Sequence, residues 1–396
     1  MDQQFKLEAT CLHALPGRNE GDLSDAAGRG HSGNRLVVNF PTEGSLMRMA
    51  SPFHMTALPE NACYDIAGWR LKVAADTPEL LQSAHELFGH YRSSRDARRF
   101  GAREDAWSVI LRRGDIDAKV LPPGCDLLWS GEVSPSVLGR NYAGPSFRRF
   151  DLADRGTCEF DLHGRAVQVT IADSVDARSA QYFLMAVLCI GLSRAGSVPV
   201  HASCLAARRG DEPCSVAIVA PSGTGKSTTS FGLTSGGWKL MGDDLALVRQ
   251  EDGGIYAWGY PRRCHVRRPT LALLPWLKDL PLTPLVQEDA WQFPLHALGE
   301  RAVESGPTPL PAGLVVLLEK PNPDGHRCES ADPATALAWI CREHVQAVEG
   351  YADPDARQAF VTLAQWVRTT PAVRVSVGPD PESLAAFLEA KTGVTA

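Results

Sequence analysis

The stretch Ser215–Val248, SVAIVAPSGTGKSTTSFGLTSGGWKLMGDDLALV, decides how the rest of the chain is interpreted. Val216–Ala220 is a short, apolar, β-branched run with the length of a buried strand. A loop of small residues, Pro221–Gly225, follows it, and Lys226–Ser235 then has the composition of a helix. A strand, a glycine-rich loop, a lysine followed by a serine, and a helix in this order predict a phosphate-binding loop.

The residue types of this loop suit a nucleoside triphosphate. Gly223 and Gly225 allow backbone conformations that turn N–H groups toward phosphate oxygens, and the dipole of the following helix adds positive potential. Lys226 is expected to contact the terminal phosphates of ATP, and the Ser227 hydroxyl to bind Mg²⁺. Ala220 stands where such loops usually carry their first glycine, and alanine is the smallest replacement. The predicted nucleotide contacts are Ser222, Gly223, Thr224, Gly225, Lys226, Ser227 and Thr228.

Two adjacent carboxylates, Asp243 and Asp244, begin 16 residues after Ser227. They follow a pair of glycines that ends the predicted helix and a short predicted strand, Trp238–Gly242. Paired carboxylates this close to the loop suggest one Mg²⁺ ligand and one general base for an attacking hydroxyl. Asp243 is predicted to be the base and Asp244 to be the Mg²⁺ partner, together with Ser227. A plain turn at a strand end is the alternative.

The longer stretch Val200–Val248, VHASCLAARRGDEPCSVAIVAPSGTGKSTTSFGLTSGGWKLMGDDLALV, resembles the HPr kinase/phosphorylase superfamily. The shared order is a histidine just before a strand, a hairpin into the loop strand, the loop, and two aspartates after the first helix. It looks most like the HPr-kinase-related proteins of bacterial peptide-biosynthesis clusters, including the lasso-peptide precursor kinases. The specific resemblance covers about Val198–Arg268 and is weaker toward the C-terminus.

This resemblance implies an ATP- and Mg²⁺-dependent kinase. Its acceptor would be a seryl hydroxyl of a peptide or small protein, such as the C-terminal serine of a lasso-type precursor. The implied fold is α/β, with a P-loop core of the HPr-kinase/PEP-carboxykinase type and a mixed sheet. In this family a histidine at the position of His201 lies beside the aspartate pair; a packed structural histidine is the alternative reading. The family's signature loop with its glutamate is not recognisable here, so phosphorylase activity is not implied.

The chain divides into three predicted parts. Residues 1–45 are rich in Gly, Asn, Arg and Asp without periodicity, so we expect a flexible N-terminal extension. Residues 46–175 combine strand-like runs, among them Tyr64–Val73, with a helix predicted over Thr77–Tyr91, as in a small α+β domain. Residues 176–396 alternate strands and helices around the phosphate-binding loop, as in an α/β catalytic domain. The long apolar segment Ala177–Ala195 is expected to be a buried helix that links the two domains.

Two groups of arginines are candidates for contact with an anionic substrate. Arg262, Arg263, Arg267 and Arg268 lie downstream of the aspartates and could stabilise transferring phosphate or a peptide carboxylate. Arg263 is the member predicted to act in catalysis. The second group, between Arg92 and Arg103, is either a solvated face or a contact for an acidic peptide.

Composition limits the class of protein. The net charge of −6 argues against general nucleic-acid binding, and no apolar run reaches membrane-spanning length. The ten cysteines form no CxxC pair, which fits a reducing cytoplasm and excludes a zinc ribbon. A cytoplasmic protein with a peptide substrate is therefore predicted, and homo-oligomerisation stays open. The rival functions are a small-molecule hydroxyl kinase and an ATP-binding regulatory partner of a biosynthetic complex.

Overall fold

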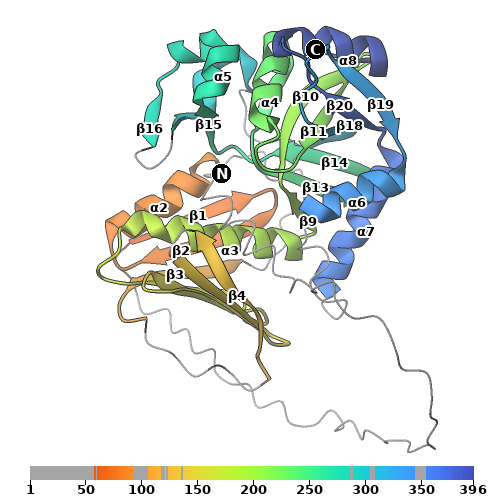
Figure 1. Ribbon diagram of the computed structural model, residues 1–396. Helices are drawn as coiled ribbons and strands as arrows, with labels where there is room; N and C mark the ends of the chain where they lie inside the picture. The colour runs from red at the N-terminus through yellow and green to blue at the C-terminus, as the bar shows by residue number, and fades with distance from the viewer. Residues whose placement is uncertain are drawn as a thin grey trace, which may run out of the picture.

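The computed structural model describes residues 58, 60–91, 106–116, 121, 124–134, 137–285, 289–303, 308–343 and 354–396. The predicted extension, residues 1–45, and the basic run Arg92–Arg103 lie outside the described residues. The described chain is a mixed α/β protein with two large sheets and a small third one. Figure 1 shows the N-terminal sheet below and the second large sheet above it.

The N-terminal sheet contains the first eight strands among the described residues. They are β1 (Glu60–Ile66), β2 (Trp69–Ala75), β3 (Trp107–Arg113), β4 (Asp126–Ser134), β5 (Val137–Ala143), β6 (Phe147–Leu152), β7 (Gly156–Asp161) and β8 (Ala166–Ile171). Their order is β1-β2-β3-β8-β7-β6-β5-β4, with parallel pairs only at β2–β3 and β3–β8. The single strand predicted over Tyr64–Val73 is wrong, because the chain makes a hairpin there. Ala67 turns it with a φ of 52°, and the Asp65 carboxylate accepts the N–H of Gly68 at 3.1 Å.

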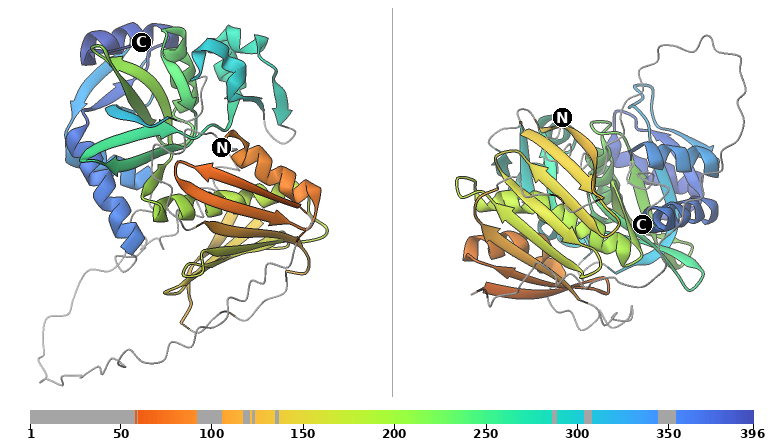
Figure 2. Two further views of the ribbon diagram at one scale, coloured as in Figure 1. Left: turned by 180° about the vertical axis from the view of Figure 1, so that it is seen from behind. Right: turned by 90° about the horizontal axis from the view of Figure 1, so that it is seen from below.

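Two helices, α2 (Pro78–Phe88) and α3 (Ala180–Arg194), cover one face of this sheet (Figures 1 and 2). The predicted N-cap of α2 is confirmed, since Thr77 Oγ1 accepts the N–H of Leu80 at 3.4 Å. Helix α3 is buried around most of its surface, as its apolar sequence predicted. A Cβ added at Gly191 would come within 2.0 Å of the Trp69 ring, so α3 lies very close to β2. It also contacts the first strand of the second sheet.

The second large sheet carries the predicted phosphate-binding loop. Its strands are β9 (Ser197–Val200), β10 (Ala202–Arg209), β11 (Glu212–Val219), β12 (Lys239–Gly242), β13 (Ala246–Glu251), β14 (Gly254–Gly259), β18 (Leu310–Leu318), β19 (Arg327–Ala331), β20 (Ala372–Ser376) and β21 (Val394–Thr395). The main path is β12-β10-β11-β18-β14-β13-β9; β20 pairs with β18 and β19, and β21 with β10. Strands β11, β18 and β20 are mutually parallel neighbours, whereas the other pairs are antiparallel. The predicted mixed sheet is confirmed.

Helices pack on both sides of this sheet. They are α4 (Lys226–Ser235), α6 (Pro333–Glu343), α7 (Pro354–Thr369) and α8 (Leu384–Thr392). Helices α4 and α8 lie side by side over one apolar cluster, which includes Phe231 and Leu388. Helices α6 and α7 pack together on the side of β13, over a second cluster that continues into the N-terminal sheet.

A three-stranded sheet beside α4 was not predicted from the sequence. It consists of β15 (Arg263–Arg267), β16 (Thr283–Leu285) and β17 (Ala290–Pro294), in the order β15-β17-β16. The short helix α5 (Arg268–Leu273) continues from β15, and Figure 1 shows it next to α4. In the view of Figure 1 this three-stranded unit lies above α2.

The N-terminal sheet with α2 and α3 forms one lobe, and the remaining described residues form the second. The two lobes are in contact at Tyr260, which follows the aspartate pair. Tyr260 Oη donates to the Leu87 carbonyl at 2.9 Å, and its ring stacks on Tyr91 with centroids 5.2 Å apart. The backbone N–H of Tyr260 donates to the Leu245 carbonyl at 2.7 Å. The end of α2 therefore supports the backbone directly after the two aspartates.

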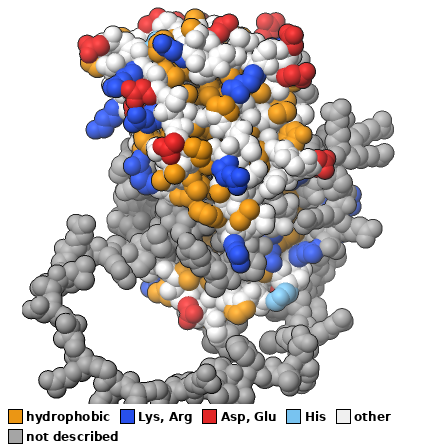
Figure 3. Space-filling model, turned by 90° about the vertical axis from the view of Figure 1, so that its right-hand side faces the viewer, with side chains coloured by type: hydrophobic (Ala, Val, Ile, Leu, Met, Phe, Trp, Pro, Cys, Tyr) orange, Lys and Arg blue, Asp and Glu red, His pale blue; other side chains and the backbone are white. Residues whose placement is uncertain are grey.

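Charged side chains are mixed over the face drawn in Figure 3. Acidic side chains gather toward one end, and lysines and arginines are spaced among hydrophobic side chains. On the described part of this face the basic side chains form no continuous stripe of the kind that follows a nucleic-acid backbone. No helix among the described residues is long and apolar enough to cross a membrane.

Candidate functional site

The glycine-rich loop joins β11 to α4 and leaves its inner side open. Gly223 and Gly225 have φ values of 80° and 107°, in the left-handed region that favours glycine. A Cβ added at either position would meet nothing within 4 Å, so there is open space beside both glycines. Helix α4 begins at Lys226, and the N–H groups of its first turn have no acceptor within the helix. The loop can therefore accept an anion such as a phosphate chain.

Gly225→Ala is expected to lower the free energy of unfolding by about 1–2 kcal/mol, because a left-handed backbone is costly for alanine. Gly89→Ala is the matched control. Gly89 also has open space around its Cβ position, but its φ of −58° is helical, so the change should be neutral or slightly stabilising. Chemical denaturation of both variants checks the difference. Equal stability would show that the conformation of Gly225 is not restricted.

Strand pairing brings His201 and the two aspartates to the same corner of the sheet. Val200 at the end of β9 pairs with Ala246 in β13, and Cys204 in β10 pairs with Gly242 in β12. Residues 201–203 therefore lie opposite residues 243–245, where both chain segments turn from one set of strands to the other. His201 is half-buried there. The structure thus brings together the predicted histidine and aspartates, which are 42 residues apart in the sequence.

Asp243 is a buried carboxyl group with one oxygen held by Ser203. The Ser203 hydroxyl donates to Asp243 Oδ1 at 3.0 Å and also contacts the Asp243 carbonyl. No described residue offers Asp243 Oδ2 a hydrogen bond of ordinary geometry, although that atom is buried. Burial, and next the neighbouring Asp244 carboxylate, raise the pKa of Asp243 to about 7, while Lys226 and the hydroxyls of Ser227 and Ser203 limit the rise. A carboxylate with this pKa can accept a proton at neutral pH.

Asp244 lies between this buried carboxyl and the loop. Its Oδ1 is 3.6 Å from Lys226 Nζ, and its side chain is 15% exposed, compared with 4% for Asp243. Within the described ranges no cluster of three His, Cys, Asp or Glu side chains could hold a metal ion alone. The donors here, two carboxylates and the Ser227 hydroxyl, suit Mg²⁺ that completes its coordination with phosphate oxygens and water. The residues therefore fit a Mg²⁺–nucleotide complex.

Two other predicted site residues, Thr228 and Arg263, have different surroundings. Thr228 Oγ1 is 2.7 Å from Thr270 Oγ1 of α5, so this hydroxyl links α4 to the small sheet. Arg263 is exposed in β15, and strand alternation places it on the opposite face from its buried neighbour Cys264. Burial, and then the charges of Asp243 and Asp244, raise the pKa of Cys264 well above its usual value, so the aspartates act on the buried face of the strand at Cys264.

The remaining arginines of this group differ in environment. Arg268 forms an exposed ion pair with Asp289 at 2.8 Å and lies over the Trp291 ring. Arg262 and Arg267 are half-buried. By the same alternation, Arg262 lies on the same side as Cys264. Its charge lowers the pKa of the Tyr260 phenol, although burial raises that pKa by more.

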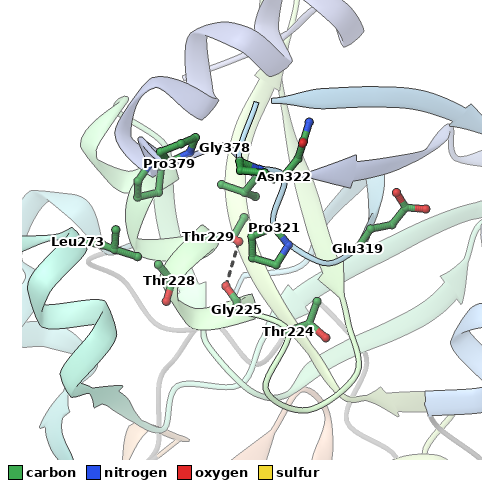
Figure 4. A pocket seen from close by; sticks show the side chains of 13 residues that line it. Thr224, Gly225, Thr228, Thr229, Leu273, Glu319, Pro321, Asn322, Gly378 and Pro379 are labelled. Carbon is green, nitrogen blue, oxygen red and sulfur yellow. Dashed lines mark hydrogen bonds between the residues drawn. The ribbon is translucent and has the colours of Figure 1, made fainter. Parts of the chain in front are cut away.

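A cavity of about 380 Å³ adjoins the loop at Thr224 and Gly225, and neither aspartate is among its lining residues. Its walls come from α4, α5 and the two loops after β18 and β20, as Figure 4 shows. The sequence analysis did not single out these loops, although both follow strands parallel to β11 and carry several prolines. Ligands of open α/β sheets bind outside the carboxyl ends of such strands.

Comparisons with protein-family models and with curated proteins found no match to this chain.

Proposed function

We propose that this protein is an ATP- and Mg²⁺-dependent kinase of the HPr kinase/phosphorylase-like superfamily, with a P-loop core of the HPr-kinase/PEP-carboxykinase type. The observation that carries the proposal is the buried carboxyl of Asp243, with a pKa of about 7 and one unpartnered oxygen, beside Lys226 at the end of an open glycine-rich loop. A binding module needs a loop and a metal ligand. A second, proton-accepting carboxyl is what a transferase needs in addition.

The transfer step uses residues already close together. The acceptor hydroxyl oxygen forms a bond to the γ-phosphorus of ATP, the bond from that phosphorus to the bridging oxygen breaks, and ADP leaves. Asp243 takes the hydroxyl proton. Lys226 and the N–H groups at the start of α4 stabilise the charge on the phosphate oxygens. Because Asp243 is almost fully buried, bulk water is kept from the base, which favours transfer over hydrolysis.

Ser227 and Asp244 are the residues that would hold Mg²⁺. Bound there, the ion would neutralise charge on the phosphate oxygens. His201, at the same corner of the sheet, would contact the phosphate or the acceptor.

We propose a seryl hydroxyl of a peptide as the acceptor. The support is the resemblance of residues 198–268 to kinases that act on protein or peptide serines, together with the N-terminal lobe. That lobe contacts Tyr260, three residues before Arg263 and sixteen after Asp244. A peptide held by this lobe would use contacts remote from the reaction to position one hydroxyl.

The full-length protein, incubated with Mg²⁺ and ATP labelled in the γ-phosphate, is expected to phosphorylate a peptide that ends in serine and to act poorly on free serine. Mass spectrometry of the products measures this. The same peptide ending in alanine is the control and should stay unmodified. Phosphate on free serine or sugars alone would replace the peptide kinase by a small-molecule kinase. ATP binding without transfer to any hydroxyl would favour the regulatory partner.

A further inference from the structure

The cavity beside the loop has no assigned occupant, and its lining indicates one. Thr224 and Gly225 of the loop and Thr228 and Thr229 of α4 form its floor. The rest of the lining comes from three other segments: Leu273, Glu319, Pro321, Asn322, Pro323, Val377, Gly378, Pro379 and Pro381. Gly225 lines the cavity, whereas Asp244 lies 3.6 Å from Lys226 Nζ and neither aspartate is among the lining residues. A triphosphate lying along the loop, with its terminal phosphate at Asp244, therefore has its nucleoside end in this cavity.

Most side chains that face the cavity are apolar. Figure 4 shows Leu273 and Pro379 on one side and Pro321 on the other, above the first turn of α4. Leu273 is 48% exposed, which is unusual for so large an apolar side chain. A flat aromatic base between these walls would cover Leu273 and bury apolar surface on both of its faces.

Four of the five polar side chains of the lining already have partners within the protein: Thr228, Thr229, Glu319 and Asn322. Figure 4 shows the Glu319 carboxylate and the Asn322 amide pointing away from the loop. Glu319 accepts a hydrogen bond from Ser376 at 3.1 Å and pairs with Arg374 at 3.7 Å. Asn322 Oδ1 accepts the N–H of Asp324 at 3.3 Å.

Backbone groups on the rim are also paired. The Asn322 N–H donates to the Val377 carbonyl at 2.9 Å. The Gly378 N–H donates to His326 Nδ1 at 2.8 Å. These bonds hold the two proline-containing loops together, and they use two N–H groups that could otherwise read the edge of a base.

We infer that this cavity takes the base of a purine nucleoside triphosphate through apolar contact, and that the protein discriminates little between adenine and guanine. This inference rests on the proposed function, because the phosphate chain must occupy the loop. Apolar contact alone discriminates related ligands by about 10–200-fold, whereas sites with buried hydrogen-bonding groups reject the wrong ligand by about 10⁴–10⁵-fold. A purine has a larger face than a pyrimidine and gains more from the same walls.

The test is calorimetric binding of ATP, GTP, CTP and inorganic tripolyphosphate, each with Mg²⁺, to the full-length protein. ATP and GTP are expected to bind within about tenfold of each other, CTP more weakly, and tripolyphosphate at least about tenfold more weakly than ATP. Leu273→Asp should weaken ATP and GTP equally, by about tenfold or more, and leave tripolyphosphate unchanged. Leu138→Asp is the control, since Leu138 is 52% exposed on the N-terminal sheet. Leu273→Ser is a milder second variant, and melting temperatures establish that both variants at position 273 fold.

The outcomes separate this inference from the kinase proposal. A preference for one purine above about 200-fold would mean that polar groups read the base, and the inference would be wrong. It would also be wrong if tripolyphosphate bound as tightly as ATP, or if the folded Leu273 variants bound ATP normally, and the kinase proposal would survive in both cases. If neither a nucleotide nor tripolyphosphate bound, both proposals would fail.

Discussion

Lys226→Ala should reduce phosphoryl transfer by at least about 10²–10³-fold while the protein stays folded. Lys226 is the cationic side chain at the start of α4, and its Nζ lies 3.6 Å from Asp244 Oδ1. Its removal takes away charge stabilisation of the transferring phosphoryl group in a site where few waters can replace it. It also removes a cation that lowers the pKa of Asp243, so this pKa should rise further and Asp243 should be a poorer base at neutral pH.

Lys239→Ala is the control for this variant. Lys239 begins β12 on the same lobe and is exposed, so its loss should leave turnover unchanged. Initial rates with saturating peptide and ATP, together with melting curves, measure both effects. A folded Lys226→Ala protein with nearly normal turnover would show that the loop does not act on phosphate, and the kinase proposal would have to be abandoned.

Local signals in the sequence predicted local structure well. Helix α4 has the predicted bounds, and Thr77 caps α2, because a glycine pair and a capping hydroxyl act within one turn of the chain. The Ala67 turn was missed because a two-residue hairpin turn usually contains Asn or Asp before glycine. Strand β6 was missed for another reason. Its buried Arg149 is paired with Asp151 at 2.6 Å, and a sequence shows no such compensation for a buried charge.

The site depended on pairing between distant strands. The sequence supplied the loop and the two aspartates, but only the ladder registers place His201 opposite them. The cavity could not be predicted from any one stretch of sequence, because α5 and the loops after β18 and β20 reach it from three separate parts of the chain. One signal was present in the sequence: the proline-containing turns around Asn322 and Pro379 both follow strongly apolar strands, where the ligand sites of parallel sheets lie. The exposed position of Arg263 followed from β15, a strand that was not predicted.

Asp243→Asn is expected to lower kcat by about 10²–10⁴-fold and to stabilise the metal-free protein above neutral pH. The two effects have one cause. The folded protein holds the pKa of Asp243 at about 7, against a usual value of 3.8, because burial and Asp244 disfavour its charged form. Between about pH 4 and pH 7 the folded state therefore keeps a proton that the unfolded state has lost. Stability from this group is fully present below the lower value and is lost as pH rises through about 7.

The pH dependence of stability therefore identifies the role of Asp243 independently of activity. Asparagine cannot ionise, so the variant escapes this loss, and its advantage in unfolding free energy should grow from near zero below about pH 4 to a few kcal/mol at pH 8. Denaturation of metal-free protein at several pH values measures it, with Asp211→Asn in the exposed β10–β11 turn as the control that should show no such trend. An advantage that does not change with pH would mean that Asp243 is already ionised without cost. Asp243 would then be better assigned as the Mg²⁺ ligand and Asp244 as the proton acceptor. Measuring the activity of the Asp244→Asn variant at increasing Mg²⁺ concentrations would decide between the two assignments. An unchanged Mg²⁺ requirement would support the exchange of roles, and a raised requirement would oppose it.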